Sequence, residues 1–205
     1  MFYETGTNRH GLSHDPFKAI VSPRPIGWIG SIDAAGRHNL APYSFFNAIG
    51  DTPKLVMFSA GGGKDSVPNI AETGVFTCSF VSRNLSDQMN LTSIAAPKGE
   101  SEFALAGLTP VTGTLVAAPF VAEAFAVLEC RVTEIFRPKD IEGVPSDNHV
   151  VIGQVIGIHI RQEAIRDGRF DVTLVRPVGR MGYRDYCDAG EVFEMTRPGQ
   201  RRVMD

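Results

Sequence analysis

The stretch SAGGGKDSVPNI, from Ser59 to Ile70, carries residue types that can hold a phosphate. Its three glycines, 61 to 63, let backbone N–H groups approach a ligand closely, and Lys64 offers a positive charge. Asp65 or Ser66 can cap a short helix that follows, and unpaired amides at a helix start attract anions. A glycine-rich turn with a solvated lysine explains the same residues, so both interpretations stay open on this stretch alone.

A nucleoside-triphosphate loop is excluded by the spacing of these residues. Such a loop requires G-x-x-x-x-G-K-[ST]. Here the residue after Lys64 is Asp65, and the residue five places before Gly63 is Phe58. The long helix that should follow is also cut short by Gly74. The stretch is therefore a candidate for another kind of phosphate.

The bulk composition limits the classes of partner. The chain has 205 residues, which suits one domain, and 43% of them are apolar, enough for a packed core. A formal net charge of -3 argues against a nucleic-acid partner, because no basic excess is available to replace phosphate counterions. We find no apolar run of about 20 residues and no signal-like N-terminus, so we expect a cytoplasmic protein without a membrane partner.

Cysteine and histidine spacing does not indicate a metal site. Cys78, Cys130 and Cys187 are scattered, and His149 and His159 lie far apart along one extended segment. We expect ordinary reduced thiols, with the first two buried in strands.

The elements that must position the glycine–lysine stretch are mostly strands. Gly (21) and Pro (13) cut the chain into short pieces, which favours strands joined by turns. The strands are predicted over residues 26–33, 39–49, 54–60, 74–82, 125–138 and 149–160. Pro42 cannot donate to a ladder, so its strand should lie at an edge or a bulge, and Gly153 and Gly157 should bend the last strand. A short helix capped by Asn84 should follow the fourth strand. This pattern predicts a mainly antiparallel β-barrel with few short helices.

Several motifs together resemble the flavin reductase-like, FMN-binding family of the flavoredoxin type. They are PRPIGWI (23–29), NLAPYSFFN (39–47), KDS with NI (64–70), EFALAGLT (102–109), LEC (128–130) and RPVGRMGYRDY (176–186). The resemblance spans about residues 15 to 198. It implies a mainly β fold, a Greek-key-like split β-barrel, over one domain of residues 1–205. An N-terminal arm of about 1–15 and a C-terminal tail of about 187–205 should flank the barrel.

The resemblance also implies the cofactor and the residues that hold it. FMN should be bound by Arg24, Ser31, Ala41, Pro42, Ser44, Asn47, Lys64, Asp65, Ser66 and Asn69. In this assignment Lys64 pairs with the phosphate, Ser66 and Asn69 bond nearby, and Arg24 and Ser31 approach the ribityl-phosphate side. Ala41, Pro42, Ser44 and Asn47 come from the strand along the flavin. No catalytic side chain is identified, because flavin carries the hydride chemistry itself.

Some of these residues also have structural interpretations. Trp28, Phe45 and Phe46 are better explained as core residues than as flavin-stacking groups. Arg24 could be a solvated charge between prolines, and Arg180 and Tyr186 should support the C-terminal tail.

Three functions follow from the resemblance. The first is reduction of FMN by NADH or NADPH in a homodimer, with reduced flavin passed to a separate oxygenase or another redox protein. The second is an electron carrier with tightly bound FMN and no direct reaction with a nicotinamide. The third is a split-barrel binding protein that has lost flavin.

Overall fold

A seven-stranded antiparallel sheet forms the centre of the fold in the computed structural model, which describes residues 1–62, 64–94, 96 and 100–198. In spatial order its strands are β3 (His38–Tyr43), β2 (Gly27–Ile32), β6 (Val75–Ser79), β9 (Ala126–Phe136), β10 (His149–Ile160), β5 (Lys54–Ala60) and β4 (Phe46–Asp51). All six neighbouring pairs run antiparallel. The predicted mainly β, antiparallel fold is confirmed.

Shorter elements surround this sheet. Three small sheets contain β1 (Arg24–Pro25) with β13 (Val178–Arg180) and β14 (Tyr186–Asp188), β7 (Pro110–Thr112) with β8 (Pro119–Val121), and β11 (Ile165–Arg166) with β12 (Arg169–Phe170). The helices are α1 (Phe17–Ile20), α2 (Ser66–Thr73), α3 (Ser86–Leu91), α4 (Glu102–Leu105) and α5 (Val172–Val175), with 3-10 turns η1 (Arg83–Leu85) and η2 (Gln162–Ala164). None of the helices in the described ranges is long and apolar enough to cross a bilayer.

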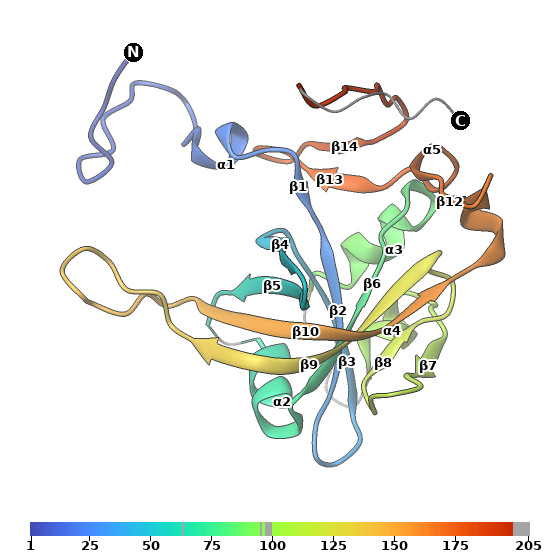
Figure 1. The fold of residues 1–205 in the computed structure, drawn as a ribbon. Coiled ribbons are helices and arrows are strands. Elements are labelled where there is room, and N and C mark those ends of the chain that lie inside the picture. The colour runs from blue at the N-terminus through green and yellow to red at the C-terminus, as the bar shows by residue number, and fades with distance from the viewer. Residues whose placement is uncertain (63, 95, 97–99, 199–205) are drawn as a thin grey trace.

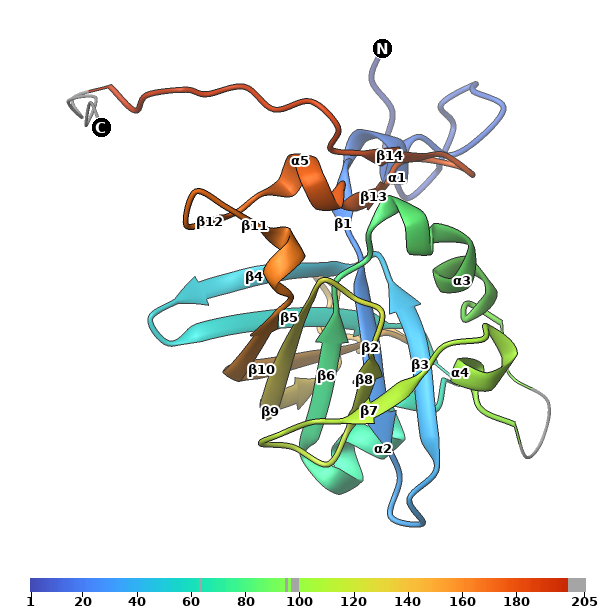
Figure 2. The same ribbon diagram turned by 90° about the vertical axis from the view of Figure 1, so that its right-hand side faces the viewer.

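The chain passes from one edge of the main sheet to the other through only Ser44 and Phe45. These residues connect β3, the first strand in the spatial order, to β4, the last one. Two edges joined by two residues must lie close together, so the sheet curls into an open barrel, as Figure 1 and Figure 2 show from two sides. The Ser59 amide donates to the Phe45 carbonyl at 2.8 Å and ties β5 to this crossing.

The crossing corrects one sequence-based prediction and confirms another. The single strand predicted over 39–49 is wrong, because β3 and β4 lie at opposite ends of the strand order. One straight strand cannot form both edges of the main sheet, so the chain bends at Ser44 and Phe45. The expected edge position of Pro42 is confirmed, since β3 pairs only with β2 in the main sheet.

The long strands β9 and β10 bend at the two predicted glycines. Their pairing register shifts between Ile152 and Gly153 and again between Val155 and Gly157. A Cβ at Gly153 would lie 2.5 Å from the Phe76 ring, so only glycine lets the strand approach the core this closely. These irregularities give the sheet its curvature.

Two apolar clusters use the alternation of side chains along β2. Trp28 belongs to a cluster with residues of α3 and α4, and Ile29 belongs to a second cluster with Phe58 and Phe76 inside the curl. Trp28 is fully buried, and its indole N–H donates to Thr92 Oγ1 at 2.8 Å. The expected core position of Trp28 is confirmed. The expected core position of Phe45 is wrong, because 37% of that residue is exposed at the crossing between the sheet edges.

The helix starts differ from the predicted caps. The predicted cap Asn84 lies inside η1, where its Oδ1 accepts from Ser82 Oγ at 2.6 Å, and α3 begins two residues later. Neither Asp65 nor Ser66 caps α2, since Asp65 precedes the helix without a side-chain cap bond and Ser66 is its first residue. The predicted stop at Gly74 is confirmed, because Gly74 has φ +71° and donates to Ile70 O.

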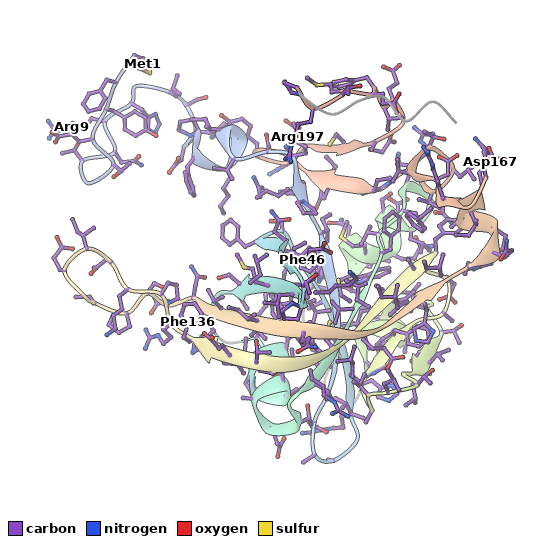
Figure 3. All side chains as sticks on the ribbon, viewed as in Figure 1. Met1, Arg9, Phe46, Phe136, Asp167 and Arg197 are labelled. Carbon is purple, nitrogen blue, oxygen red and sulfur yellow. The ribbon has the colours of Figure 1, made fainter. Side chains whose placement is uncertain are left out.

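Both ends of the described chain lie away from the barrel. Figure 3 places Met1 and Arg9 on the N-terminal arm and Arg197 on the C-terminal segment, with the main sheet below both segments. Met1, Phe2, Phe193 and Met195 are at least 81% exposed. The last part of the predicted C-terminal tail, residues 199–205, lies outside the described residues.

Candidate functional site

A small cavity lies beside the start of α2, where the sequence predicts a phosphate. It has a volume of about 90 Å³. Its lining residues are Asn39, Ala41, Lys64, Asp65, Ser66, Thr92, Ser93, Ile94 and Glu102. They come from β3, the segment before α2, the residues after α3, and α4. We call it the donor cavity because of the hydrogen-bond donors described next.

Ser66 forms the centre of a buried polar network under the donor cavity. Its hydroxyl oxygen accepts from Asn39 Nδ2 at 2.8 Å and from the Tyr43 hydroxyl at 2.9 Å. Two accepted bonds use both lone pairs, so the Ser66 proton is left to donate. No described residue accepts that proton.

Ser31, in β2, also accepts two hydrogen bonds through its hydroxyl oxygen. Its oxygen accepts from Asn39 Nδ2 at 3.1 Å and from Asn69 Nδ2 at 3.4 Å. Its own proton also has no acceptor within the described ranges. The amide of Asn39 therefore aligns two serine hydroxyls so that each can donate to a further group.

Burial keeps Tyr43 in its donating form. Desolvation raises the pKa of the Tyr43 phenol to about 12, and the carboxylates of Asp65 and Glu102 act in the same direction. The hydrogen bond to Ser66 acts in the opposite direction and is the smaller influence. The phenol is therefore protonated at neutral pH and donates to Ser66.

The charges around the donor cavity are mixed. Lys64 Nζ lies 5.2 Å from the centroid of the Tyr43 ring and has no ion pair with any described residue. The Glu102 carboxylate is held by the Leu40 amide at 3.1 Å, on the outer edge of β3. Among the residues lining the cavity, Lys64 is thus the cation available to an incoming anion. The carboxylates of Asp65 and Glu102 repel an anion and limit the negative charge that can bind there.

Glycine freedom contributes less to this loop than the sequence suggests. Gly61 and Gly62 are not among the glycines with positive φ, and added Cβ atoms would meet only Asn148 Oδ1 at 3.6 Å and Asp147 O at 3.8 Å. Gly63, the third residue of the predicted loop, lies outside the described residues.

The structure brings together part of the predicted set. Ala41, Lys64, Asp65 and Ser66 line the donor cavity, and Ser31 and Asn69 join the hydrogen-bond network behind it. Pro42 is half-buried beside Ala41 on β3. Asn47 is exposed on β4 and its Oδ1 accepts from the Ala48 amide.

Arg24 and Ser44 instead line a second, open cleft of about 900 Å³. The Arg24 guanidinium is buried and donates to the carbonyls of Lys18, Val21 and Met181. These bonds tie the segment around α1 to the residues after β13. The interpretation of Arg24 as a solvated charge is wrong, because only 6% of the residue is exposed.

Arg180 and Tyr186 support the C-terminal segment, as expected. The Arg180 guanidinium carbon lies 4.4 Å from the centroid of the Tyr186 ring, and its Nη2 donates to the Tyr183 carbonyl at 2.5 Å. The two residues also face each other in the β13–β14 pair.

Comparison with known proteins identifies the family. Residues 21–176 match the model of the flavin reductase like domain. The chain belongs to this family. The curled half-barrel is thus the split barrel that the sequence resemblance implied, and that prediction is confirmed.

Three solved structures illustrate the likeness of this flavin reductase like domain. Nitrilotriacetate monooxygenase component B from Bacillus cereus superposes with a TM-score of 0.85 at 28% identity, covering 95% of this chain and 98% of that chain. A 2-nitrobenzoate 2-nitroreductase from Pseudomonas fluorescens gives 0.83 at 26%, with 97% of both chains covered. Flavoredoxin of Desulfovibrio vulgaris (Miyazaki F) gives 0.77 at 25%, covering 87% and 93%.

The donor set of the flavin reductase like domain fits the phosphate end of FMN. Phosphate oxygens accept hydrogen bonds, and the residues lining the donor cavity include Ser66, with an uncommitted hydroxyl proton, and Lys64, with its ammonium group. A ring-bearing ligand needs a pocket of roughly 300–1,000 Å³. At about 90 Å³ the donor cavity takes only a group of phosphate size, so a flavin ring would lie outside it.

Sequence reasoning missed Asn39, Tyr43 and Glu102. The first two could have been found, because a strand places Asn39, Ala41 and Tyr43 on one face. Glu102 reaches β3 from a helix 62 positions away from Leu40 in the chain, and no local pattern signals that contact.

The described residues offer no metal site. No group of three His, Cys, Asp or Glu side chains among them is placed to hold a metal ion. Cys78 and Cys130 are buried in strands as expected, and burial raises the pKa of the Cys78 thiol to about 12.

Replacing Ser66 with alanine should destabilise the fold by about 1–2 kcal/mol, since two buried donors lose their acceptor. Those donors are Asn39 Nδ2 and the Tyr43 hydroxyl. Urea unfolding of Ser66→Ala, compared with the control Ser93→Ala at an exposed position of the cavity wall, measures the effect. Equal midpoints for the two variants would contradict the network.

Proposed function

We propose that this flavin reductase like domain is an FMN-binding oxidoreductase that accepts hydride from NADH or NADPH. The donor cavity carries the proposal, because the free ammonium of Lys64 and the free hydroxyl proton of Ser66 line it and suit a phosphate monoester. Lys64 supplies charge to the phosphate, while Ser31, Ser66 and Asn69 donate hydrogen bonds. Asp65 borders the phosphate and leads the chain into α2.

The rest of the cofactor lies along the outer edge of β3 in this proposal. Ala41 forms a small wall of the donor cavity, and Pro42 leaves that edge without an amide donor. Ser44 and Asn47 continue this path around the crossing to β4. Arg24 lines the 900 Å³ cleft with Ser44, and its buried guanidinium holds the segment around α1 on that side of the cofactor.

Bound flavin supplies the acceptance and release of hydride. The side chains of this protein hold and orient it. The buried Ser31–Asn39–Ser66–Tyr43 network fixes the two serine hydroxyls before any ligand arrives, which lowers the ordering cost of binding.

Two partners belong to the proposal. The likeness to component B of a monooxygenase supports a separate oxygenase as the consumer of reduced flavin. The second partner is another copy of this chain in a homodimer, as the sequence resemblance to this family implies.

A flavoredoxin-like electron carrier is the second candidate. It is favoured by the superposition with Desulfovibrio vulgaris flavoredoxin over 87% of this chain. A carrier would hold FMN in the same donor cavity and would take its electrons from a protein instead of a nicotinamide.

An absorbance spectrum before and after anaerobic addition of NADH or NADPH separates the candidates. We expect the FMN-loaded protein to be yellow and its flavin band to bleach faster than in a protein-free mixture. A yellow protein that neither nicotinamide bleaches would establish the carrier. A protein that leaves FMN fluorescence unquenched would refute both candidates and leave a flavin-free binding protein.

A further inference from the structure

A fully buried carboxylate lies in β9, away from the donor cavity. Glu129 has no exposed surface, and its oxygens accept from the amides of Thr114, Leu115 and Val116 at 2.8, 2.6 and 3.0 Å. The fourth donor is Nε2 of His159 in the neighbouring strand β10. The carboxylate thus has four donors and no solvent.

The pairing register explains why these two side chains meet. Glu129 stands opposite Gly157, and His159 lies two residues further along β10 on the same face. Gly157 presents no side chain, so the imidazole reaches across diagonally to the carboxylate. The bulge between Val155 and Gly157 sets this register.

The contact with Glu129 determines which nitrogen of His159 carries the proton. A carboxylate only accepts, so Nε2 holds hydrogen and donates to Glu129. The other nitrogen, Nδ1, then has a lone pair in the neutral ring. It has no hydrogen-bond partner among the residues that the structure describes.

His159 lines an open cavity of about 430 Å³ at this end of the barrel. Phe120 and Phe125 supply aromatic walls, and the Phe120 ring lies 4.9 Å from the imidazole at an angle of 36°. Ala122, Ala124 and Ala126 line the same cavity with small side chains that leave room for a flat ring. Its volume lies within the range of small-molecule pockets, roughly 300–1,000 Å³.

One positive charge borders this cavity. The Arg161 guanidinium lies 5.7 Å from the centroid of the Phe125 ring and contacts Glu163 at 3.1 Å. Both groups of that pair are about half-exposed, so the ion pair is weak and the guanidinium can turn to a ligand.

From this geometry we propose that the cavity beside His159 binds a hydroxy-aromatic ligand, a phenol, with His159 Nδ1 as the acceptor of its hydroxyl proton. The phenol ring packs between Phe120 and Phe125, and its O–H donates to Nδ1. When the O–H bond breaks, the proton forms an N–H bond at Nδ1 and the electron pair remains on the phenolate oxygen. Glu129 stabilises the imidazolium through Nε2 and acts as a positioning residue. This site is independent of the proposed flavin chemistry.

Titration of the full-length protein with 4-nitrophenol tests the site, because the phenol and its phenolate absorb at different wavelengths. We expect saturable binding and a phenolate fraction above that of the protein-free solution at the same pH. In His159→Gln the glutamine amide still donates to Glu129 but offers no base in place of Nδ1. Affinity should fall about tenfold, and the excess phenolate should disappear.

His149→Gln is the matched control, because His149 begins β10 at the opposite end from the cavity. It should bind 4-nitrophenol like the unaltered protein. Ala122→Phe should abolish binding by filling the cavity from a partly exposed position. Absence of saturable binding, equal affinity of His159→Gln and His149→Gln, or displacement of 4-nitrophenol by FMN would each overturn the proposal. FMN affinity, measured in the same variants, reports separately on the donor cavity.

Discussion

Lys64→Met should weaken FMN binding by about 10- to 100-fold. A hydrogen bond to a charged group contributes roughly 1.5–3 kcal/mol, which corresponds to this range. Lys64 is the one cation lining the donor cavity in the described residues, and no carboxylate among them pairs with it. Methionine keeps an apolar stem of similar length against the Tyr43 ring while it removes the charge. Quenching of FMN fluorescence on titration measures the affinity.

Salt and a second lysine make this test specific. The loss should shrink as salt rises, since Lys64 is exposed and its attraction to phosphate is screened. Lys54→Met is the control, because Lys54 is also exposed but pairs with Asp51 at the far end of β5. Equal FMN affinity of the two variants would remove the donor cavity from the proposed function. Riboflavin, which lacks the phosphate, should bind Lys64→Met and the unaltered protein alike.

Most strands of the main sheet and the end of α2 were predictable because their signals are local. Alternation, glycine position and proline position are read within a few residues, and Pro42, Gly74, Gly153 and Gly157 each do what their chemistry requires. The ammonium group of Lys64 and the hydroxyl group of Ser66 are also local signals, because the two residues lie two positions apart in the chain.

The crossing between sheet edges was not predictable from local pattern. The residues from Asn39 to Ile49 read as one strand, and only the closing of the sheet divides them into β3 and β4. Arg24 is also buried by a long-range contact, because its acceptor Met181 lies 157 positions away in the chain and is brought to it by the pairing of β1 with β13.

The site residues divide in the same way. Asn39 lies within the quoted motif NLAPYSFFN, and strand periodicity alone places it beside Ala41 and Tyr43. The position of Glu102 depends on the packing of α4 against β3. The contact between Glu129 and His159 depends on the pairing register of β9 and β10. A one-residue change of register would turn His159 to the other face of β10, so sequence alone could not pair it with Glu129.

Glu129→Gln should lower the free energy of unfolding by about 3 kcal/mol at neutral pH, because a buried group with several donors loses its charge. A glutamine amide has one acceptor oxygen, and the NH₂ must face donors on one side. Either Thr114 and His159, or Leu115 and Val116, then meet a donor in place of an acceptor. Glu134→Gln, at an exposed position of the same strand, should change stability by less than about 0.5 kcal/mol.

The pH dependence gives this prediction a sign. Burial by itself raises the pKa of the Glu129 carboxyl, but the hydrogen bonds from His159 and the three amides together hold it below its ordinary value. A carboxyl whose pKa is lower in the folded state stabilises the fold fully above its unfolded pKa of about 4.3, and that contribution is lost as pH falls through the folded value. The stability gap between the unaltered protein and Glu129→Gln should therefore narrow as the pH falls below about 4.3. Urea midpoints measured from pH 5 down to pH 3 test this, and a gap that stays the same over that range would show that Glu129 is not held as a carboxylate.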